Sequence, residues 1–356
     1  MTQTTAYSAL PHIAIAGSED RDLAANIIAM IVEETSDGLY RCEITLSNFG
    51  PNRSRMDYLY LDRQKLDFGT ALAISFGPPR ADVKIFEGRI SALEASYSLG
   101  GTSTLTVLAE DRLQDLRMTR RTRSFEQMSD SDILRRIAGE HSLTPQIQLD
   151  GPTHAVVAQV NQSDLAFIRD RARACDTEVW VEGSTLHAAR RSDRAAGNVR
   201  LAYGVGLIEF TVRADLAHQR SEVGVSGWDV AGKTAISEVA ARSEISSELG
   251  GDTGGSQILE QAFAPRRERV VHTVPLTSSE ARAIAQVRYR ERARRFVCGH
   301  GFAEGDPRIR VGCTAELSGL GAMFDGRYYV VRACHSFDLD QGFKTEFDVE
   351  RAGIGS

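Results

Sequence analysis

The feature that most constrains the fold of this chain is a hairpin pattern that occurs twice. Phe86–Arg89 has the sequence FEGR and Phe324–Arg327 has FDGR, and each is followed by a run of alternating polar and apolar residues. A turn that contains glycine, Gly100 in one copy and Gly342 in the other, then leads to a second alternating run. Alternation with a period of two predicts β-strands, so each copy predicts a β-hairpin. The same unit present twice in one chain indicates a duplicated β domain.

Two further blocks precede each hairpin in the same order. A glycine followed six residues later by a serine occurs in both copies, starting at Gly69 and at Gly312. Further upstream, Arg41–Gly50 aligns with Arg220–Asp229. The alternating apolar residues just before them also match: Ile28, Met30 and Val32 correspond to Ile208, Phe210 and Val212. The repeat predicts six equivalent structural turn residues: Gly69, Gly88, Arg89, Gly312, Gly326 and Arg327. The alternative is that unrelated hairpins share common turn chemistry.

The repeat divides the chain into three parts. Residues 1–123 are predicted to form a first β-barrel, residues 124–200 a small α/β module of two helices and a hairpin, and residues 201–356 a second barrel. A Gly/Ser-rich loop, expected to be mobile, and a helix are inserted into the second barrel at about 236–298. The predicted fold class is mainly β with an α+β insertion.

Each of three predicted helices begins at a side chain that can accept a hydrogen bond from a free backbone N–H group. Ser129 or Ser131 begins the first helix, Ser163 the second, and Thr277 the third, which runs over Thr277–Phe296 with a capping-box glutamate. The third helix is rich in arginine. We interpret these arginines as a solvated or subunit-contacting face rather than a nucleic-acid surface, because cations near a helix C-terminus also complement the helix dipole.

Composition excludes several classes of protein. The chain of 356 residues is 42% hydrophobic and 25% charged, which is ordinary for a globular protein. Its formal net charge of −6 argues against a protein that binds nucleic acid over its whole surface. The five cysteines are scattered without a CxxC motif, which predicts neither a disulfide framework nor a zinc site. The sequence shows no signal peptide and no long apolar run, so we expect no membrane span and folding in the cytoplasm.

The sequence contains few reactive residues in patterns typical of catalytic sites. The best cluster of reactive types is Cys298, His300 and Asp306, in a segment whose glycines are more typical of turns. We therefore predict no catalytic residue, no metal site, no cofactor and no enzyme activity. A stand-alone glycan- or peptide-binding protein would need exposed aromatic residues, but Trp180 and Trp228 both lie on alternating strands and are expected in the core.

Two segments resemble a known family. Residues 160–189, with a Ser-Asp-Leu helix start followed by a hairpin, and residues 305–352 are similar to the phage late-control protein D and VgrG family of baseplate hubs. These hubs serve contractile tails and contractile injection systems. The resemblance implies two tail-tube-like β-barrels per chain. It also implies a structural, virion-type component that acts as a homotrimer and joins the hexameric tail tube to a trimeric central spike.

The resemblance also implies the partners and the location. They are the tail tube protein, the spike protein, and the tape measure and baseplate proteins, with DNA or protein cargo passing through the lumen. The particle would assemble in the bacterial cytoplasm. VgrG-type chains continue beyond the second barrel and this sequence does not, so we expect the spike to be a separate polypeptide. The alternatives are a truncated type VI secretion VgrG and a cell-wall-degrading or glycan-binding protein associated with a tail.

Overall fold

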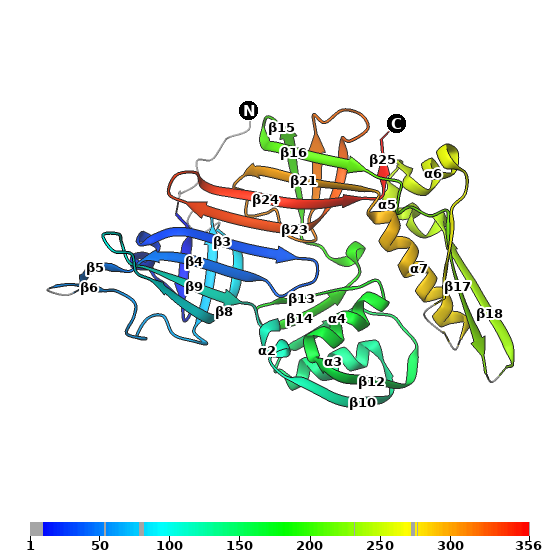
Figure 1. Cartoon of the computed structure of the whole chain (residues 1–356), viewed down its shortest axis with the longest axis horizontal. Helices are drawn as coiled ribbons and strands as arrows, with labels where there is room; N and C mark the ends of the chain where they lie inside the picture. Colours follow the sequence, from blue (N-terminus) through cyan, green and yellow to red (C-terminus); the bar gives the residue numbers. More distant parts are fainter. Residues whose placement is uncertain are drawn as a thin grey trace.

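The computed structural model describes residues 10–52, 55–77, 82–230, 232–271, 275 and 277–355. Thirteen strands form one continuous sheet in the order β2-β1-β7-β8-β9-β4-β3-β23-β22-β15-β16-β21-β24. This sheet contains two curled β units, which lie at the left and the top of Figure 1. An α/β module lies below them, and an inserted helix with a long hairpin lies at the right. The predicted class, mainly β with two related barrels and a small module, is confirmed.

The first β unit curls around its own apolar core. Its elements are β1 (His12–Ile15), β2 (Ser18–Glu19), α1 (Arg21–Ala25), β3 (Ile27–Thr35), β4 (Arg41–Ser47), β5 (Phe49–Asn52), β6 (Arg55–Tyr58), β7 (Ala71–Phe76), β8 (Val83–Ser96) and β9 (Thr104–Glu110), followed by α2 (Leu113–Arg117). Alternate residues of β4 are buried, among them Cys42, Ile44 and Leu46. This alternation is what a strand with one face in the core requires.

The second β unit is a closed barrel of six strands. These are β15 (Asn198–Tyr203), β16 (Gly206–Ala214), β21 (Val297–Glu304), β22 (Thr314–Ser318), β23 (Gly326–Asp338) and β24 (Gly342–Arg351). The ring closes because β15 pairs with both β16 and β22, and β23 pairs with both β22 and β24. In the first unit, by contrast, no pairing joins β1 to β3 within the described residues.

Five strands of the two barrels correspond in order, direction and register: β3, β4, β7, β8 and β9 match β16, β21, β22, β23 and β24. A bulge interrupts β3 after Ile27 and β16 after Leu207. Another interrupts β8 after Ile90 and β23 after Val330. Bulges re-aim a strand at one fixed position, so coincident bulges define which residues correspond. The sixth strand differs, since β1 runs antiparallel to β7 whereas β15 runs parallel to β22.

The predicted correspondence of Gly69 with Gly312 is correct. Gly88 and Gly326 lie on corresponding strands, as predicted, but not at corresponding positions. Gly69 and Gly312 both have positive φ, and their N–H groups donate to Ile90 and Val330, the two residues that precede the matching bulges. Gly88 lies inside β8, opposite Leu72.

Gly326 lies at the start of β23, opposite Leu317. Arg89 faces Glu110 across β8 and β9, and the residue in its place in β23 is Tyr329, opposite Glu350. Gly88–Arg89 and Gly326–Arg327 are therefore two residues out of register. The sequence pattern could not detect this, because a shift of two keeps every side chain on the same face of a strand.

The third predicted block is wrong. Arg220–Asp229 contains β17 (Glu222–Asp229), which lies in a separate three-stranded sheet and not in the barrel. The counterpart of β4 is β21, which pairs with β16 and β24 as β4 pairs with β3 and β9. Val223 and Val225 are buried at alternate positions of β17. Alternation indicates a strand with one buried face but not the sheet to which it belongs.

The module contains more strand than expected. It comprises β10 (Arg120–Ser129), α3 (Asp130–Glu140), β11 (Thr144–Ile147), β12 (Thr153–Ser163), α4 (Asp164–Ala174), β13 (Glu178–Glu182), β14 (Thr185–Ala189) and the 3-10 turn η1 (Arg191–Asp193). Ser129 and Ser163 cap the two helices as predicted, and Gly183 forms the hairpin turn with positive φ. The long antiparallel ribbon of β10 and β12 was missed.

The insertion begins earlier than predicted, and its described residues form mostly helices and strands. It comprises β17, β18 (Thr234–Ala241), the 3-10 turn η2 (Arg242–Ile245), α5 (Ser246–Leu249), β19 (Thr253–Gly254), α6 (Gly255–Phe263), β20 (Arg267–Val270) and α7 (Ser278–Arg294), and β19 pairs with β25 (Gly353–Ile354). The Gly/Ser-rich stretch is therefore not the loop that we expected, since it contains α5, β19 and the start of α6. Its glycines have packing and turn roles: Gly250 ends α5 with positive φ, and a Cβ at Gly255 would clash with Phe296.

The corresponding turn glycines give a matched stability test. Alanine at either Gly69 or Gly312 must adopt positive φ, which costs roughly 1–2 kcal/mol. A Cβ at Gly69 meets open space, whereas one at Gly312 would lie 2.6 Å from Cδ of the buried Arg194. We expect Gly312→Ala to lower the midpoint of urea unfolding more than Gly69→Ala does. Equal losses would show that the contact with Arg194 does not affect the stability of the Gly312→Ala variant.

Candidate assembly surfaces

The two barrels are joined by main-chain pairing of β3 with β23. Arg332 lies opposite Thr35, and the antiparallel register continues to Asp338 opposite Ala29. One edge of the 13-residue β23 pairs with β22 over its first part and with β3 over its second. His335 and Phe337 are 0% and 3% exposed in the second part. The two barrels therefore share one sheet, a junction far stiffer than a linker.

Charged side chains reinforce this junction. Glu34 is almost fully buried, forms an ion pair with Arg310 and accepts a hydrogen bond from the N–H of Val311. Arg332 contacts Glu33 at 2.7 Å on β3 and Glu346 at 2.6 Å on β24. Burial, together with the charge of Arg310, lowers the pKa of His335 to about 3, so its ring is neutral in the junction.

A second cluster, centred on Glu178, joins the module to both barrels. Glu178 on β13 contacts Arg191 at 3.1 Å and Arg194 at 2.9 Å, and it accepts a hydrogen bond from the Tyr329 hydroxyl at 2.6 Å. Arg194 also donates to the hydroxyl of Tyr40. Burial and the charge of Glu178 raise the pKa of Tyr329, so its hydroxyl remains a donor. The carboxylate therefore joins the module to Tyr329 of the second barrel directly, and to Tyr40 of the first barrel through Arg194.

The arginines of α7 form ion pairs within the chain, and Arg282, Arg288 and Arg295 also remain exposed, as expected of a solvated face. Arg294 is buried and contacts Asp176 of the module at 2.5 Å and Glu248 at 2.8 Å. The other arginines pair similarly: Arg282 with Glu238, Arg288 with Glu291, Arg290 with Glu244, Arg292 with Glu268 and Arg295 with Glu350. Helix α7 therefore braces the insertion against the module and the second barrel.

Two buried aspartates anchor the helices of the module. Asp130 starts α3 and contacts Arg171 and His154, and Asp164 starts α4 and contacts Arg123 and His141. Burial by itself would raise the pKa of Asp130, but the hydrogen bonds and charge of Arg171 and His154 lower it below its ordinary value. Both carboxylates follow directly after the serine that caps their helix, where a negative charge also complements the helix dipole.

The candidate reactive residues do not converge. Nδ1 of His300 contacts Asp348 at 2.7 Å, while Asp306 pairs with Arg308. Burial, with a contribution from Glu350, raises the pKa of the Cys298 thiol, which is the opposite of what a nucleophile needs. The described residues contain no group of three or more possible metal ligands and no helix long and apolar enough to cross a membrane. Trp180 is buried as expected, but Trp228 is 50% exposed because it lies on the outer face of β17.

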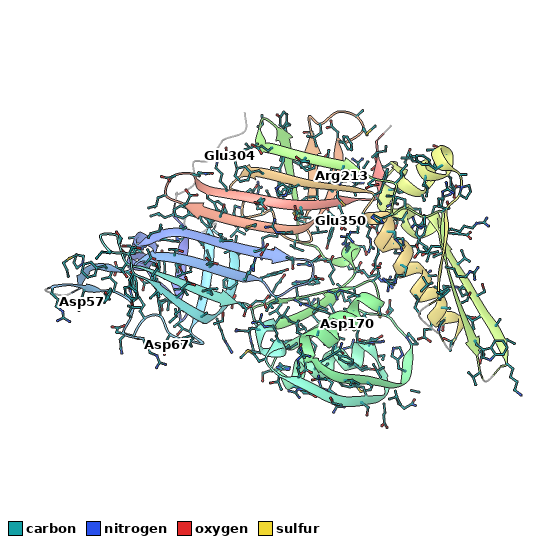
Figure 2. The ribbon with its side chains drawn as sticks, in the orientation of Figure 1. Asp57, Asp67, Asp170, Arg213, Glu304 and Glu350 are labelled. Carbon is teal, nitrogen blue, oxygen red and sulfur yellow. The ribbon has the colours of Figure 1, made fainter. Side chains whose placement is uncertain are left out.

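Two strand edges are left open on the barrels. Within the described residues, β8 pairs with β7 only up to Arg89, so the same edge is free from Ala92 to Ser96. The outer edge of β16 pairs with β15 only at Gly206 and Leu207 and is free from there to Ala214. Figure 2 shows Arg213 near the end of β16 in the upper β unit, well away from Asp57 and Asp67 at the left in the first unit. Open edges of this kind are ready-made pairing surfaces.

Comparison with known proteins shows which proteins this chain is similar to. A family model described as the Alg8 N-terminal domain matches residues 9–338. The chain belongs to this family. No curated protein sequence matches the chain. The family therefore rests on a match that spans both barrels, the module and the insertion.

Solved structures share the fold at low sequence identity. The 43 kDa tail protein of prophage MuSo2 from Shewanella oneidensis has 13% identity and a TM-score of 0.70, covering 96% of this chain and 98% of that one. A tail protein from Neisseria meningitidis MC58 has 12% identity and a TM-score of 0.67, with 97% of both chains covered.

An E. coli component of the type VI secretion system has 12% identity and a TM-score of 0.56, covering 93% of this chain and 76% of that one. The resemblance to the hub family is thus confirmed in the fold.

Sequence reasoning missed the charged residues that join the parts. Glu178, Arg191 and Arg194 belong to no motif, and each also has a partner more than 150 residues away in the sequence: Tyr329, Glu350 and Tyr40. One signal was available: Glu34 continues the alternation of the buried residues Met30 and Val32 on β3. A carboxylate at an inward position of a strand indicates a buried partner, because an isolated buried charge is strongly unfavourable.

Asp130 predicts a specific dependence of stability on pH. Because its folded pKa is lowered, it stabilises the fold above about pH 4, the ordinary pKa of an aspartate, and this contribution is lost as the pH falls through the folded pKa. Asp130→Asn should lower the free energy of unfolding at pH 7 by about 3–5 kcal/mol, since Arg171 loses its buried partner. The difference from the wild type should shrink as the pH falls below about 4.

The matched control is Asp150→Asn, because Asp150 is 95% exposed. Its unfolding curve, measured by urea titration at each pH, should follow the wild type. A constant difference between Asp130→Asn and wild type across the acid range would contradict the assigned role.

Proposed function

We propose that this chain is a non-catalytic structural hub of a contractile tail or injection particle. Its fold is that of phage tail proteins and of a type VI secretion component, which supports a place in such a particle. The observation that carries the proposal is the pair of barrels with five matching strands, fixed side by side by β3 and β23. A rigid pair of similar barrels gives each copy two similar docking surfaces at a constant spacing.

We propose further that three copies form a closed ring. Three chains present six similar barrels, which suit a hexameric tail tube, while true threefold symmetry remains for a trimeric central spike. The module and the insertion occur once per chain, so they would mark the threefold character of the ring. The partners in this proposal are the tail tube protein, the spike protein, and the tape measure and baseplate proteins, assembled in the bacterial cytoplasm.

In this proposal the protein acts by holding its parts in a fixed arrangement and not by catalysis. The charged clusters around Glu178 and Arg294 hold module, barrels and insertion together, and their carboxylates are all occupied by arginines. Such pairs resist rearrangement, because separating either partner leaves an unpaired buried charge. A rigid adaptor between two symmetries needs this resistance more than it needs a pocket.

Cryo-electron microscopy of particles from the producing cells tests the proposal. We expect three copies in one ring between the tube and the spike, and a deletion of the gene should abolish assembled tails. Purified protein should release no products from peptidoglycan in a turbidity assay, with lysozyme as the positive control. Six copies, a single axial copy, tails that assemble without the protein, or wall degradation would contradict it.

A further inference from the structure

Two outer strand edges of the barrels correspond to the two edges that form the junction within the chain. Within the described residues, β23 uses its edge from Arg332 to Asp338 to pair with β3. The matching edge of β8, from Ala92 onwards, has no partner. The matching strand of β3 is β16, and its edge from Ile208 to Ala214 has none either. The chain therefore carries both halves of a second junction but cannot bring them together by itself.

Exposure marks the same two edges. Phe337 is 3% exposed because it packs in the core of the first barrel beside Phe76, whereas Tyr97, in the corresponding place after β8, is 60% exposed. Tyr97 has one aromatic neighbour, Tyr58, at a ring distance of 5.8 Å. On the other edge, Ile208 is 37% exposed. A neighbouring strand would remove this apolar surface from water.

We propose that β8 of one copy pairs antiparallel with β16 of a second copy of this chain, repeating the β3–β23 junction between molecules. This rests on the proposed function, in that it supplies the contact that closes the ring. The register follows from the internal template, in which Arg332 faces Thr35 and Ser336 faces Ile31. The expected partners are Ala92 with Asp215, Leu93 with Ala214, Glu94 with Arg213, Ala95 with Val212, and Ser96 with Thr211.

Charge supports this register independently. Glu94 and Arg213 are exposed, and neither takes part in an ion pair within the described residues. The template brings these two unpaired and opposite charges face to face. Opposite charges directly across a strand pair stabilise it, whereas like charges destabilise it. A register displaced by one residue would place Glu94 opposite Val212 or Ala214 and turn the side chains to the wrong faces.

A second copy fits these edges better than another extended peptide. The two edges belong to matching strands of one chain, and the same pair of matching strands already forms the intramolecular junction. Pairing head to tail leaves neither of these two edges free once the ring has closed, so the pairing stops at the closed ring.

Disulfide trapping tests both the register and the closure. The variant Ser96→Cys, Thr211→Cys, Cys298→Ser places one thiol on each edge and removes the exposed native thiol. After mild oxidation of concentrated protein, non-reducing gels should show a ladder that ends at three chains. Either new cysteine alone should give no ladder, and Glu126→Cys in place of Ser96→Cys should abolish it, because Glu126 is exposed on β10, away from both edges. No ladder, a ladder that passes three chains, or equal linking through Glu126→Cys overturns the pairing.

A charge swap provides a second, independent readout. Glu94→Arg and Arg213→Glu should each reduce the trimeric fraction in sedimentation experiments, and the double variant should recover it. Glu126→Arg is the matched control and should leave the trimeric fraction unchanged. A swap that fails to recover the trimer overturns the register. If three copies are present in the particle but these variants assemble normally, the hub function stands and only this contact is wrong.

Discussion

The pairing of β3 with β23 is the interaction on which the rest of the structure depends. It requires a strand of 13 residues in the second barrel, because the first part of β23 must pair with β22 and the second part must reach β3. Backbone hydrogen bonds along this edge fix both the distance and the rotation between the barrels. The same geometry leaves β8 and β16 with open outer edges, so the intramolecular junction determines what an intermolecular one can look like.

Ion pairs also hold the barrels, the module and the insertion in position relative to one another. Arg310 reaches back to Glu34, Glu178 gathers Arg191 and Arg194, and Arg294 reaches from α7 to Asp176 of the module. These contacts join parts whose apolar residues also meet, since Trp180 of the module and Phe337 of β23 lie in the core of the first barrel. Each pair includes a side chain that is buried or nearly buried. Buried pairs add modest net stability, but they penalise any arrangement that separates the partners. They therefore specify one relative placement of barrels, module and insertion.

The sequence allowed the duplication to be recognised, because strand alternation and matching turns are local signals. Ile28–Val32 and Ile208–Val212 were aligned correctly, since they occupy equivalent positions in β3 and β16. The helix caps at Ser129 and Ser163 were predictable for the same reason. Which sheet β17 joins was not predictable, since Val223 and Val225 alternate in the same way in either sheet. The register of Gly88 against Gly326 also escaped, because a two-residue slip preserves both faces.

The long-range pairs of the candidate assembly surfaces, such as Glu178 with Tyr329, leave no local pattern in the sequence. Glu34 was the exception, as a carboxylate at an inward position. The open edges became visible only once the two barrels could be compared strand by strand, because an edge is a property of the sheet and not of the strand.

Hydrogen exchange of backbone amides, compared between the free chain and the proposed ring, tests the central claim most directly. Edge-facing amides of Ala29–Thr35 and Arg332–Asp338 should exchange slowly in both states, because the junction is internal to the chain. Those of Ala92–Ser96 and Ile208–Ala214 should exchange rapidly in the free chain and slowly in the ring. Rapid exchange at β3 and β23 in the free chain, or an assembled ring in which β8 and β16 gain no protection, would contradict the account.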